Sequence, residues 1–408
     1  MKNSSLLFII IALIAFFALG CAGNQNNGNN NTDYEIVHVD IPDTFANAAE
    51  LVSYIRIGWS LGNTLDSWGN RNGFSWLGGG SYANTSVSQM ETAWLGGSPV
   101  TSKATITALK EAGFNAIRIP VTWFKALGAN NTVRADWMAR VKEVVDYVID
   151  NDMIAIINSH HDEEVFKFTN AQTDQSLVIY KRLWEQIAET FKNYNERLVF
   201  EGLNEPRTKG ADHEWTGGNA EERNNLNRYY QLFVDTVRQS GGNNSRRILI
   251  LNTYGASPVQ AAMTGLVIPN DTVPDRIIVS IHFYEPYNFA LNTNASFNSW
   301  SKNNSADTSP ITDRVNRAYN TFVSKGIPVV IGEFGAMNKN NEAVRAEWAE
   351  FYVKTAMNRG IPCIWWDNGA FSGNGELFGL INRSSNKITY PLVLAGLMRG
   401  VSGWRKTE

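Results

Sequence analysis

The sequence predicts an α/β protein built as a single (β/α)8 TIM barrel. Eight short apolar runs of strand length recur along the chain, and segments with helical periodicity lie between many of them. Several helical segments end alike, in Gly113, in Gly326 before Pro328 and in Gly360 before Pro362, which is typical of a helix that stops before a strand. Buried strands that alternate with helices form a parallel sheet, and eight parallel strands close into a barrel.

The first residues indicate export. Lys2 precedes the apolar run Leu6–Leu19, which is shorter than the roughly 20 residues that span a bilayer and fits the hydrophobic part of a secretory signal. The following Gly20-Cys21 resembles a bacterial lipoprotein cleavage motif. We therefore expect residues 1–21 to be a lipoprotein-like signal peptide, with a lipid on Cys21 as the only membrane attachment. Ordinary cleavage nearby would instead give a secreted protein.

The domain organisation follows from composition. Residues 22–33 are rich in Asn and Gly, so we expect a flexible tether over residues 22–44. The pattern is regular from there on, and residues 45–404 are expected to form one catalytic domain. Its expected strands are Ile57–Gly62, Phe114–Val121, Ile154–His160, Leu198–Asn204, Ile248–Thr253, Ile277–Tyr284, Val329–Phe334 and Cys363–Asp367. Apolar stripes predict helices over Trp137–Ile149, Leu177–Asn193 and Ala343–Asn358.

Composition argues against several classes of protein. A formal net charge of -3 and a pI of about 6.0 give no sign of a nucleic-acid partner. Two cysteines do not make a disulfide framework, and Cys363, inside an apolar run, is expected to be an inert core thiol. The 13 Trp, 14 Tyr and 20 Phe exceed what core packing needs, so some are candidates for stacking on the flat face of a ligand.

Polar side chains gather at the C-terminal ends of the apolar runs, where a barrel of this kind has its active site. Glu205 and Glu333 each follow a buried run. The same ends supply Arg118, His160, His161, Asn204, His282, Tyr284, Trp365, Trp366, Asp367 and Asn368. One such residue is often an ordinary rim residue, but their number indicates a common site.

Two carboxylates with an arginine, histidines and aromatic rings suit glycoside hydrolysis, which needs a neutral acid and an ionised carboxylate. We expect Arg118 to keep Glu333 ionised. Glu205 has no evident cationic partner in the sequence, so burial is expected to keep it protonated. We also expect the Asn204 amide to bind a sugar hydroxyl and Tyr284 to donate a hydrogen bond to the nucleophile. Trp366 is expected to form the floor under the sugar ring.

Two other chemistries are less well supported. His160, His161 and His282 are zinc-ligand types, but no His-x-His or His-Glu-x-x-His motif occurs and no Asp or Cys completes a clear ligand set. A serine nucleophile lacks the Gly-x-Ser-x-Gly elbow. We expect no metal and no organic cofactor.

Six motifs in matching order resemble glycoside hydrolase family 5, a family of retaining (β/α)8 enzymes. They are Arg118–Trp123, Asn158–Asp162, Gly202–Pro206, His282–Pro286, Ile331–Gly335 and Trp365–Asn368. Three more look like subfamily 4, which acts on β-1,4-glucans, xyloglucan and sometimes xylan: Leu61–Asp66, Glu91–Trp94 and Glu214–Gly218. The loops at residues 68–82 and 95–98 depart from that subfamily, on the presumed non-reducing side of the cleft.

The resemblance implies that Glu205 is the acid/base and Glu333 the nucleophile. It implies supporting roles for Arg118, His160, Asn204, His282 and Tyr284, and substrate contacts from Asn63, Trp94, His161, Trp366 and Asn368. In the loop after the sixth run, four aromatic residues are expected either to stack on sugars or to pack within the loop: Tyr287, Phe289, Phe297 and Trp300.

The expected function is that of an exported, monomeric, retaining endo-β-1,4-glucanase whose partner is a polysaccharide: cellulose, xyloglucan or mixed-linkage glucan. Retention predicts carboxyl groups about 5–5.5 Å apart. Two alternatives stay open, a xylanase or mannanase of the same mechanism and a non-catalytic, glycan-binding surface lipoprotein.

Overall fold

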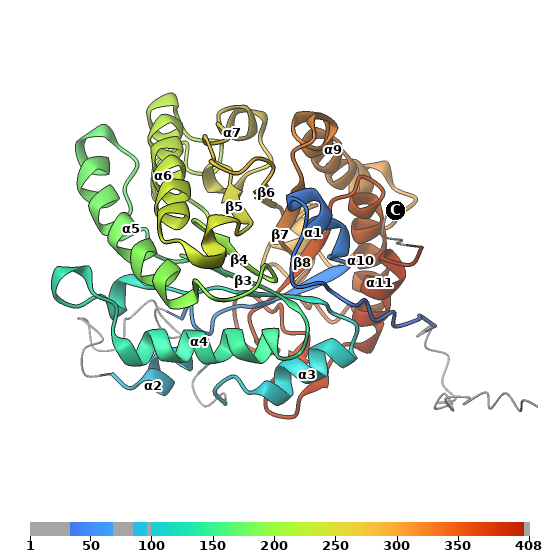
Figure 1. Cartoon of the computed structure of the whole chain (residues 1–408). Coiled ribbons are helices and arrows are strands. Elements are labelled where there is room, and N and C mark those ends of the chain that lie inside the picture. The colour runs from blue at the N-terminus through green and yellow to red at the C-terminus, as the bar shows by residue number, and fades with distance from the viewer. Residues whose placement is uncertain (1–32, 68–84, 96–98, 404–408) are drawn as a thin grey trace, which may run out of the picture. The chain divides into compact units, whose positions relative to one another are not determined.

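The computed structural model describes residues 33–67, 85–95 and 99–403. Eight parallel strands close into one barrel in chain order, with helices around it (Figure 1). The predicted (β/α)8 fold is confirmed. The strands are β1 (Ile57–Leu61), β2 (Ala116–Ile119), β3 (Ile154–Asn158), β4 (Leu198–Glu201), β5 (Leu249–Asn252), β6 (Ile277–His282), β7 (Val329–Phe334) and β8 (Cys363–Asp367).

The three helices predicted from apolar stripes are present as α4 (Ala135–Ile149), α5 (Asn170–Phe191) and α10 (Glu342–Met357). The other α-helices are α1 (Ala48–Tyr54), α2 (Val87–Glu91), α3 (Lys103–Glu111), α6 (Ala220–Gln239), α7 (Gln260–Thr264), α8 (Tyr287–Ala290), α9 (Ser305–Thr321) and α11 (Pro391–Gly400), and β9 (Ile381–Asn382) pairs with β10 (Lys387–Ile388). Gly113, Gly326 and Gly360 have positive φ, as expected for glycines that end helices.

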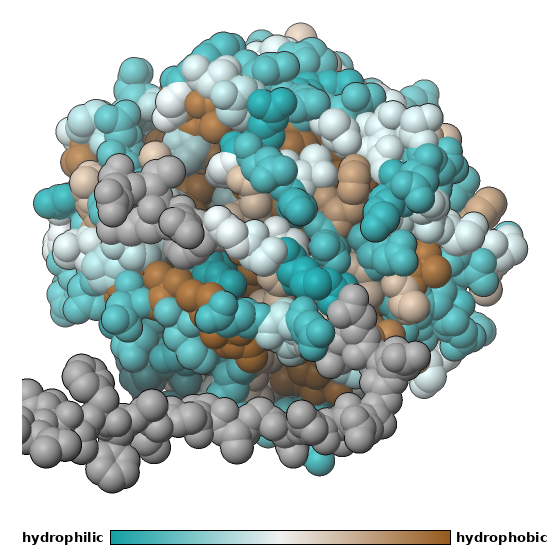
Figure 2. Space-filling model, turned by 90° about the vertical axis from the view of Figure 1, so that its right-hand side faces the viewer, coloured by the Kyte–Doolittle hydropathy of each residue, from teal (hydrophilic) through white to brown (hydrophobic). Residues whose placement is uncertain are grey.

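The helices pack their apolar stripes against the strands and turn polar faces to solvent. In α4, for example, Trp137, Val141 and Val148 are buried, whereas hydrophilic residues predominate on the face that Figure 2 shows. Cys363 is fully buried in β8, as predicted, and burial raises the pKa of its thiol well above the ordinary value. Across the described residues, every helix is too short or too polar to cross a membrane.

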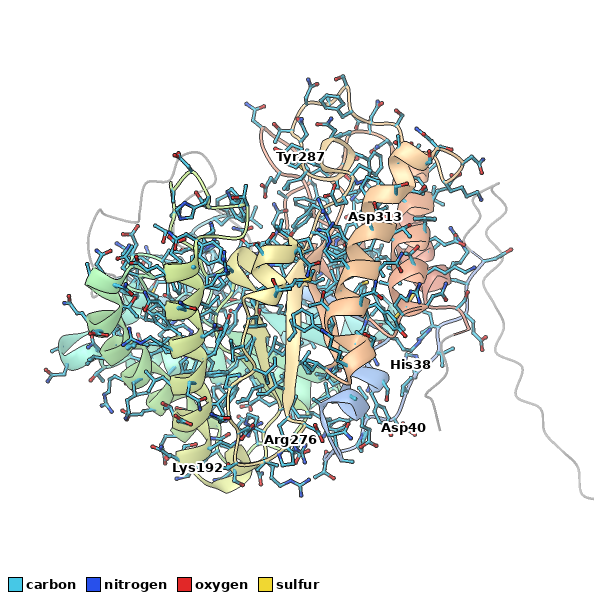
Figure 3. All side chains as sticks on the ribbon, turned by 90° about the horizontal axis from the view of Figure 1, so that it is seen from above. His38, Asp40, Lys192, Arg276, Tyr287 and Asp313 are labelled. Carbon is cyan, nitrogen blue, oxygen red and sulfur yellow. The ribbon has the colours of Figure 1, made fainter. Side chains whose placement is uncertain are left out.

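The segment before β1 closes the bottom of the barrel. Ile41, Phe45 and Leu51 are buried in a cluster with residues from the N-terminal ends of the strands, such as Ile154 and Val330. The predicted tether therefore ends before residue 44, because Ile41 finds apolar partners on the barrel. Figure 3 shows the two ends: Lys192 and Arg276 lie at this end and Tyr287 at the opposite end.

A bulge in β7 sets the register at the active-site end. Ile281 pairs with Ile331 but His282 pairs with Glu333, so Gly332 is an extra residue in β7. A Cβ on Gly332 would lie 2.8 Å from His282 Nε2, too close for any other residue. The glycine therefore lets the bulge form and places Glu333 opposite His282.

Candidate active site

The strand ends bring the predicted residues together. Arg118, Asn204, Tyr284 and Glu333 form one hydrogen-bonded group at the C-terminal end of the barrel, and the hydrogen-bonded pair of His282 and Glu205 lies beside it. These six residues come from β2, from the loop after β4, from β6 and its following loop, and from β7.

Glu333 receives a hydrogen bond on each carboxylate oxygen. Arg118 Nη1 donates to Oε1 at 2.6 Å, and Tyr284 Oη donates to Oε2 at 3.0 Å. Burial raises the pKa of Tyr284 well above its ordinary value, and the charge of Glu333 adds to this effect, so the phenol keeps its proton. The contact between Arg118 and Glu333 that the sequence predicted is therefore present.

Arg118 has a second carboxylate partner that sequence reasoning missed. Glu201 accepts from Arg118 Nε at 2.7 Å and from Nη2 at 2.9 Å, and Asn252 Nδ2 donates to it at 2.5 Å. Burial acts to lower the pKa of Arg118, but the charges of Glu201 and Glu333 raise it above the ordinary value. The available signal was a carboxylate inside the buried run 198–204, which requires a buried cation.

Asn204 is oriented by the same guanidinium. Arg118 Nη2 donates to Asn204 Oδ1 at 2.7 Å, and the Asn204 backbone N–H donates to the Ser159 carbonyl at 2.9 Å. The amide oxygen is therefore engaged by the protein. The NH₂ group is left to donate to an acceptor in the site.

Glu205 has a different environment from the one expected. His282 Nδ1 lies 3.1 Å from its Oε1, and Arg207 Nη1 lies 3.5 Å from its Oε2. Burial acts to raise the pKa of Glu205, but the hydrogen bond from His282 and the charge of Arg207 outweigh it and hold the pKa below the ordinary value. The expectation that burial alone keeps Glu205 protonated is wrong for the ligand-free protein, because Arg207 lies beside it.

The two candidate carboxylates face each other across His282. One oxygen of Glu205 and one of Glu333 lie within 4.8 Å, and His282 Nδ1 is 3.7 Å from Glu333 Oε2. Retaining glycosidases have carboxyl groups about 5–5.5 Å apart, and inverting ones about 6.5–9.5 Å apart. The short distance between these two oxygens suits direct attack by one carboxylate.

His160 and His161 form a cluster with Asp66, in which one metal-ligating atom of each residue lies within 4.8 Å of the others. Val121 N–H donates to Asn158 Oδ1 at 3.1 Å, so the amide Nδ2, 3.1 Å from His160 Nδ1, donates to that nitrogen. The proton of His160 is then on Nε2, and neither ring nitrogen keeps a free lone pair for a metal. Burial, with the positive charges nearby, lowers the pKa of His160 well below its ordinary value. His160 suits a neutral donor better than a metal ligand.

Trp366 forms a wall of the site. Its ring stacks parallel to His160, with centroids 5.7 Å apart, and it packs on Met337 and Phe378. A Cβ on Gly62 would lie 2.7 Å from the indole, so only glycine at this position allows the ring to lie flat. The position fits the predicted floor under a sugar.

The other predicted substrate residues divide into two groups. Asn63, Trp94 and His161 are partly exposed. Asn368, in contrast, is fully buried: its Oδ1 accepts from the N–H groups of Ala370 and Phe378, and its Nδ2 donates to the Glu376 carbonyl. Asn368 therefore holds a loop, and the prediction that it binds substrate is wrong.

Exposure separates the aromatic residues of the loop after β6. Phe289 and Trp300 are 4% and 5% exposed and belong to the core, whereas Tyr287 and Phe297 are 58% and 38% exposed. Trp215, in the loop after β4, is 54% exposed and was not predicted as a ligand contact. Its ring lies 4.3 Å from the Arg207 guanidinium. An exposed indole held by a buried arginine was not visible in the sequence pattern.

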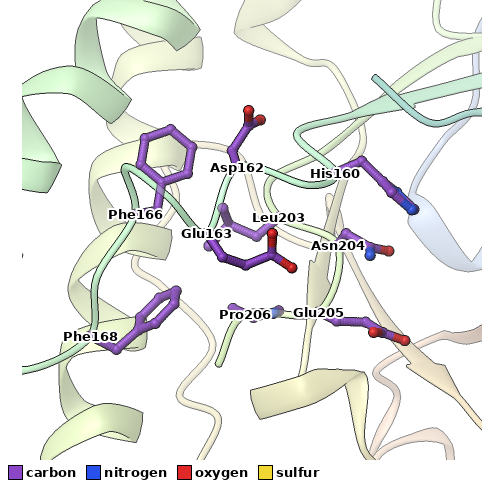
Figure 4. Close-up of a pocket in the computed structure, with 9 residues that line it drawn as sticks. All are labelled: His160, Asp162, Glu163, Phe166, Phe168, Leu203, Asn204, Glu205 and Pro206. Carbon is purple, nitrogen blue, oxygen red and sulfur yellow. The ribbon is translucent and has the colours of Figure 1, made fainter. Parts of the chain in front are cut away.

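A small pocket adjoins Glu205 between the loops after β3 and β4 (Figure 4). Glu163 and Glu205 present carboxylates around it, and the buried rings of Phe166 and Phe168 form one part of its wall. The lining residues are His160, Asp162, Glu163, Phe166, Phe168, Leu203, Asn204, Glu205 and Pro206. The loop at residues 68–82, most of the segment 95–98, and Cys21 lie outside the described residues.

Comparison with known proteins agrees with this geometry. A family model described as cellulase (glycosyl hydrolase family 5) matches residues 79–372. Endoglucanase A of Clostridium longisporum is 44% identical over 355 residues, which are 86% of this chain and 66% of that protein. A GH5-4 broad specificity endoglucanase from Ruminococcus champanellensis, solved with cellotriose, is 45% identical with a TM-score of 0.79, over 86% of this chain and 98% of that one.

A glycoside hydrolase 5 lichenase from Caldicellulosiruptor sp. F32, solved as a mutant with cellotetraose, is 40% identical with a TM-score of 0.80. The match covers 90% of this chain and 99% of that chain. The chain thus spans nearly all of these two structures but about two thirds of the Clostridium protein.

Proposed function

Because the chain belongs to the cellulase family, glycosyl hydrolase family 5, we propose that it is an endo-β-1,4-glucanase that hydrolyses β-glucan polysaccharides by double displacement. The observation that carries this proposal is the pair of carboxylates within 4.8 Å. Glu333 accepts hydrogen bonds from Arg118 and Tyr284, and Glu205 lies opposite it as the partner that exchanges a proton. Nucleophile and acid/base are the two roles that retaining hydrolysis needs.

In the first step a Glu333 oxygen attacks the anomeric carbon, and the bond from that carbon to the leaving sugar breaks. Glu205 gives its proton to the leaving oxygen. In the free protein the pKa of Glu205 lies below its ordinary value. Glu205 therefore has to take up this proton when substrate binds, as water is excluded and the charge of Glu333 disfavours a second negative charge. His160 Nε2–H and the Asn204 amide are donors for sugar hydroxyls beside the reacting carbon.

The substrate class follows from the relatives and from the aromatic residues of the site. Cellotriose and cellotetraose are bound in two of the related structures, and one relative is a lichenase. In this chain Trp366 offers a face at the reacting sugar, and Trp215 and Tyr287 are exposed at the same end. We propose cellulose, xyloglucan and mixed-linkage glucan as substrates, cut within the chain.

The test is the release of reducing ends and the loss of viscosity on carboxymethyl-cellulose, xyloglucan, lichenan, xylan and mannan in parallel. We expect fast viscosity loss on the glucans and a β-configured first product by NMR. Glu333→Gln keeps the shape of the side chain but lacks the nucleophilic charge. It is expected to abolish hydrolysis while it still binds cellotetraose.

Other results would change the assignment. Activity on xylan or mannan alone would keep the mechanism and overturn the substrate. An α-configured first product would overturn retention. Binding without hydrolysis by the unmodified protein would favour a glycan-binding surface lipoprotein.

We also propose that the protein is exported, is anchored by a lipid on Cys21 at the cell envelope and acts as a monomer. The apolar run 6–19 and the following cysteine support export and lipidation. Palmitate labelling of the full chain in a bacterial host, compared with Cys21→Ala, tests the anchor. Loss of label and release from the membrane fraction in the variant are expected, whereas an unlabelled parent chain would leave secretion alone.

A further inference from the structure

Arg207 connects Glu205 to the loops at the rim of the site. Its Nη1 donates to the Glu205 backbone carbonyl at 2.8 Å and lies 3.5 Å from Glu205 Oε2. The side chain is 9% exposed. Arg207 is therefore a fixed and nearly buried cation beside the acid/base carboxyl.

Three neighbours hold this cation in place. Glu214 accepts from Arg207 Nε at 2.8 Å, and Glu163 lies 3.3 Å from Nη1. Trp215 covers the guanidinium face at 4.3 Å. Because Glu163 comes from the loop after β3 and Glu214 and Trp215 from the loop after β4, the guanidinium cannot leave Glu205 without breaking contacts on two loops. The geometry fixes a positive charge where Glu205 changes its own charge.

Several other charged groups lie near Glu205, and the effect of the Arg207 charge adds to theirs. His282 lies 3.1 Å from its Oε1 and His161 adds a further positive charge. Glu333 lies within 4.8 Å on the opposite side, and Glu376, from the loop after β8, adds a second negative charge near both carboxylates. Arg207 is the cation of permanent charge in this group, since a guanidinium does not lose its proton in proteins.

Glu205 needs opposite forms in the two steps of the proposed reaction, on which this inference rests. It must be protonated to assist the leaving sugar and ionised to activate water. We propose that Arg207 is a positioning residue that stabilises the Glu205 carboxylate and fixes its direction for the second step, and thereby speeds the release of the glycosyl-enzyme. In that step the water oxygen bonds to the anomeric carbon and the bond from that carbon to Glu333 breaks, its electron pair returning to Glu333. One proton of the water passes to Glu205.

The two steps are separated with 2,4-dinitrophenyl β-cellobioside, whose leaving group departs without a proton. Release of the glycosyl-enzyme then limits turnover. Arg207→Met keeps an apolar stem under Trp215 but removes the charge. We expect its kcat on this substrate to fall roughly 10-fold, a part of the factor that a general base supplies, with a fall in KM because the intermediate accumulates. Azide, which attacks without a base, is expected to restore turnover and give β-cellobiosyl azide.

Variants with opposite charge changes distinguish this role from a structural one. Arg207→Met removes a positive charge beside Glu205, so Glu205 holds its proton to higher pH. On carboxymethyl-cellulose, whose leaving sugar needs that proton, the alkaline limb of kcat/KM is expected to move up by roughly one pH unit. Glu214→Gln removes a negative charge from the far side of Arg207, so the same limb moves down. Arg207→Lys keeps the charge and is expected to stay nearer the parent in both measurements.

The inference is overturned if kcat on the dinitrophenyl substrate stays within twofold and azide has no effect. It is also overturned if Arg207→Met and Glu214→Gln move the alkaline limb in the same direction, which a loss of structure would do. If Arg207→Met does not fold, Arg207→Lys and Glu214→Gln still give the test. Failure of the parent protein to hydrolyse any β-glucan would instead reject the proposed function itself.

Discussion

Arg118 and Glu201 form a buried ion pair with two hydrogen bonds, at 2.7 and 2.9 Å, and both side chains are 1% exposed. This pair uses Nε and Nη2 of the guanidinium, which leaves Nη1 to donate to Glu333 Oε1, 2.6 Å away. Glu201 touches no reacting atom in the proposed mechanism. It orients the arginine that holds Glu333, the proposed nucleophile.

Replacement of Glu201 by Gln is therefore expected to reduce both stability and turnover. One amide oxygen replaces two carboxylate oxygens, and the amide NH₂ faces N–H donors of Arg118. Breaking a buried pair costs about 3–5 kcal/mol in the free energy of unfolding, to be measured by urea denaturation. We expect kcat on xyloglucan or carboxymethyl-cellulose to fall as well, because Arg118 loses its orientation toward Glu333.

A matched control lies elsewhere in the protein. Arg238 and Asp271 form a similar buried fork, with hydrogen bonds of 2.8 and 2.7 Å. Asp271→Asn is expected to lose stability but to keep kcat once the fraction of folded protein is taken into account. An equal loss of kcat in both variants would contradict the assigned role of Glu201.

Local patterns in the sequence were enough to predict the barrel and the residues at its rim. The repeated strands and the helix-ending glycines are local signals, so the barrel and its eight strands followed from the sequence. The rim residues followed as well, because the ends of parallel strands meet at one edge of the sheet. Arg118 could be paired with Glu333 on chemistry alone, since a buried arginine needs a carboxylate.

Side-chain direction and long-range partners were not predictable in the same way. Glu201 was missed because its partners Arg118 and Asn252 come from other strands of the barrel. Arg207 was missed because its contact with Glu205 depends on the path of the backbone after β4. Asn368 was misassigned because a polar residue at a strand end can satisfy loop amides instead of facing the site. Gly332 carried a usable signal, since glycine inside a strand often marks a bulge.

Trp215 is the exposed ring that we expect to bind the leaving-group side of the substrate. It lies on Arg207, which contacts the acid/base Glu205. Trp215→Ala is expected to raise KM on cellohexaose about 5- to 10-fold, which corresponds to roughly 1–1.4 kcal/mol, with little change in the binding of short inhibitors that fill only the other side.

Two variants serve as controls for Trp215. Trp215→Phe keeps an aromatic face and is expected to lie between the parent and the alanine variant. Val267→Ala changes an exposed apolar residue between α7 and β6 and is expected to leave KM unchanged. If the inhibition constant of the short inhibitors rose together with the KM for cellohexaose, the effect would lie outside the leaving-group side.

Lys339 fastens the loop that carries Tyr287 and Phe297. Its ammonium donates to the carbonyls of Asn288, Phe289 and Phe297 at 2.7, 2.9 and 3.0 Å. The side chain is nearly buried, at 7% exposed. All three N–H groups of one ammonium are thus used by one loop, which holds the two exposed rings in position.

Lys339→Met is expected to leave these three carbonyls without their donor. At about 1–3 kcal/mol for each buried group left unsatisfied, and with partial relief by water, we expect a loss of roughly 2–4 kcal/mol. Amide hydrogen exchange in residues 287–298 is expected to speed up. The exposed Lys302 in the same region is the control, and Lys302→Met is expected to change neither quantity. Unchanged exchange in Lys339→Met would show that other contacts hold the loop.

Asp162, which lies close to the site, makes the stability of the protein depend on pH. Its Oδ1 accepts from the N–H groups of Trp123 and Phe124 at 2.8 Å each, and its Oδ2 accepts from Ser159 Oγ at 2.5 Å. Burial nevertheless raises the pKa of Asp162 to about 6, against 3.8 for an ordinary aspartate. A raised pKa means that the folded protein binds this proton more tightly than the unfolded chain. The contribution to stability is therefore complete below pH 3.8 and is lost as the pH rises through 6.

Asp162→Asn mimics the protonated side chain at every pH and is expected to remove this dependence. Asn Oδ1 can accept from the same two N–H groups, and its NH₂ can donate to Ser159 Oγ. From about pH 4 to about pH 7.5 the stability of the variant relative to the parent is expected to rise by roughly 3 kcal/mol, at 1.36 kcal/mol per pKa unit. Urea denaturation at a series of pH values measures the difference, with the exposed Asp212→Asn as control. A difference that stays constant with pH would mean that the backbone hydrogen bonds outweigh burial and that Asp162 is ionised throughout this range.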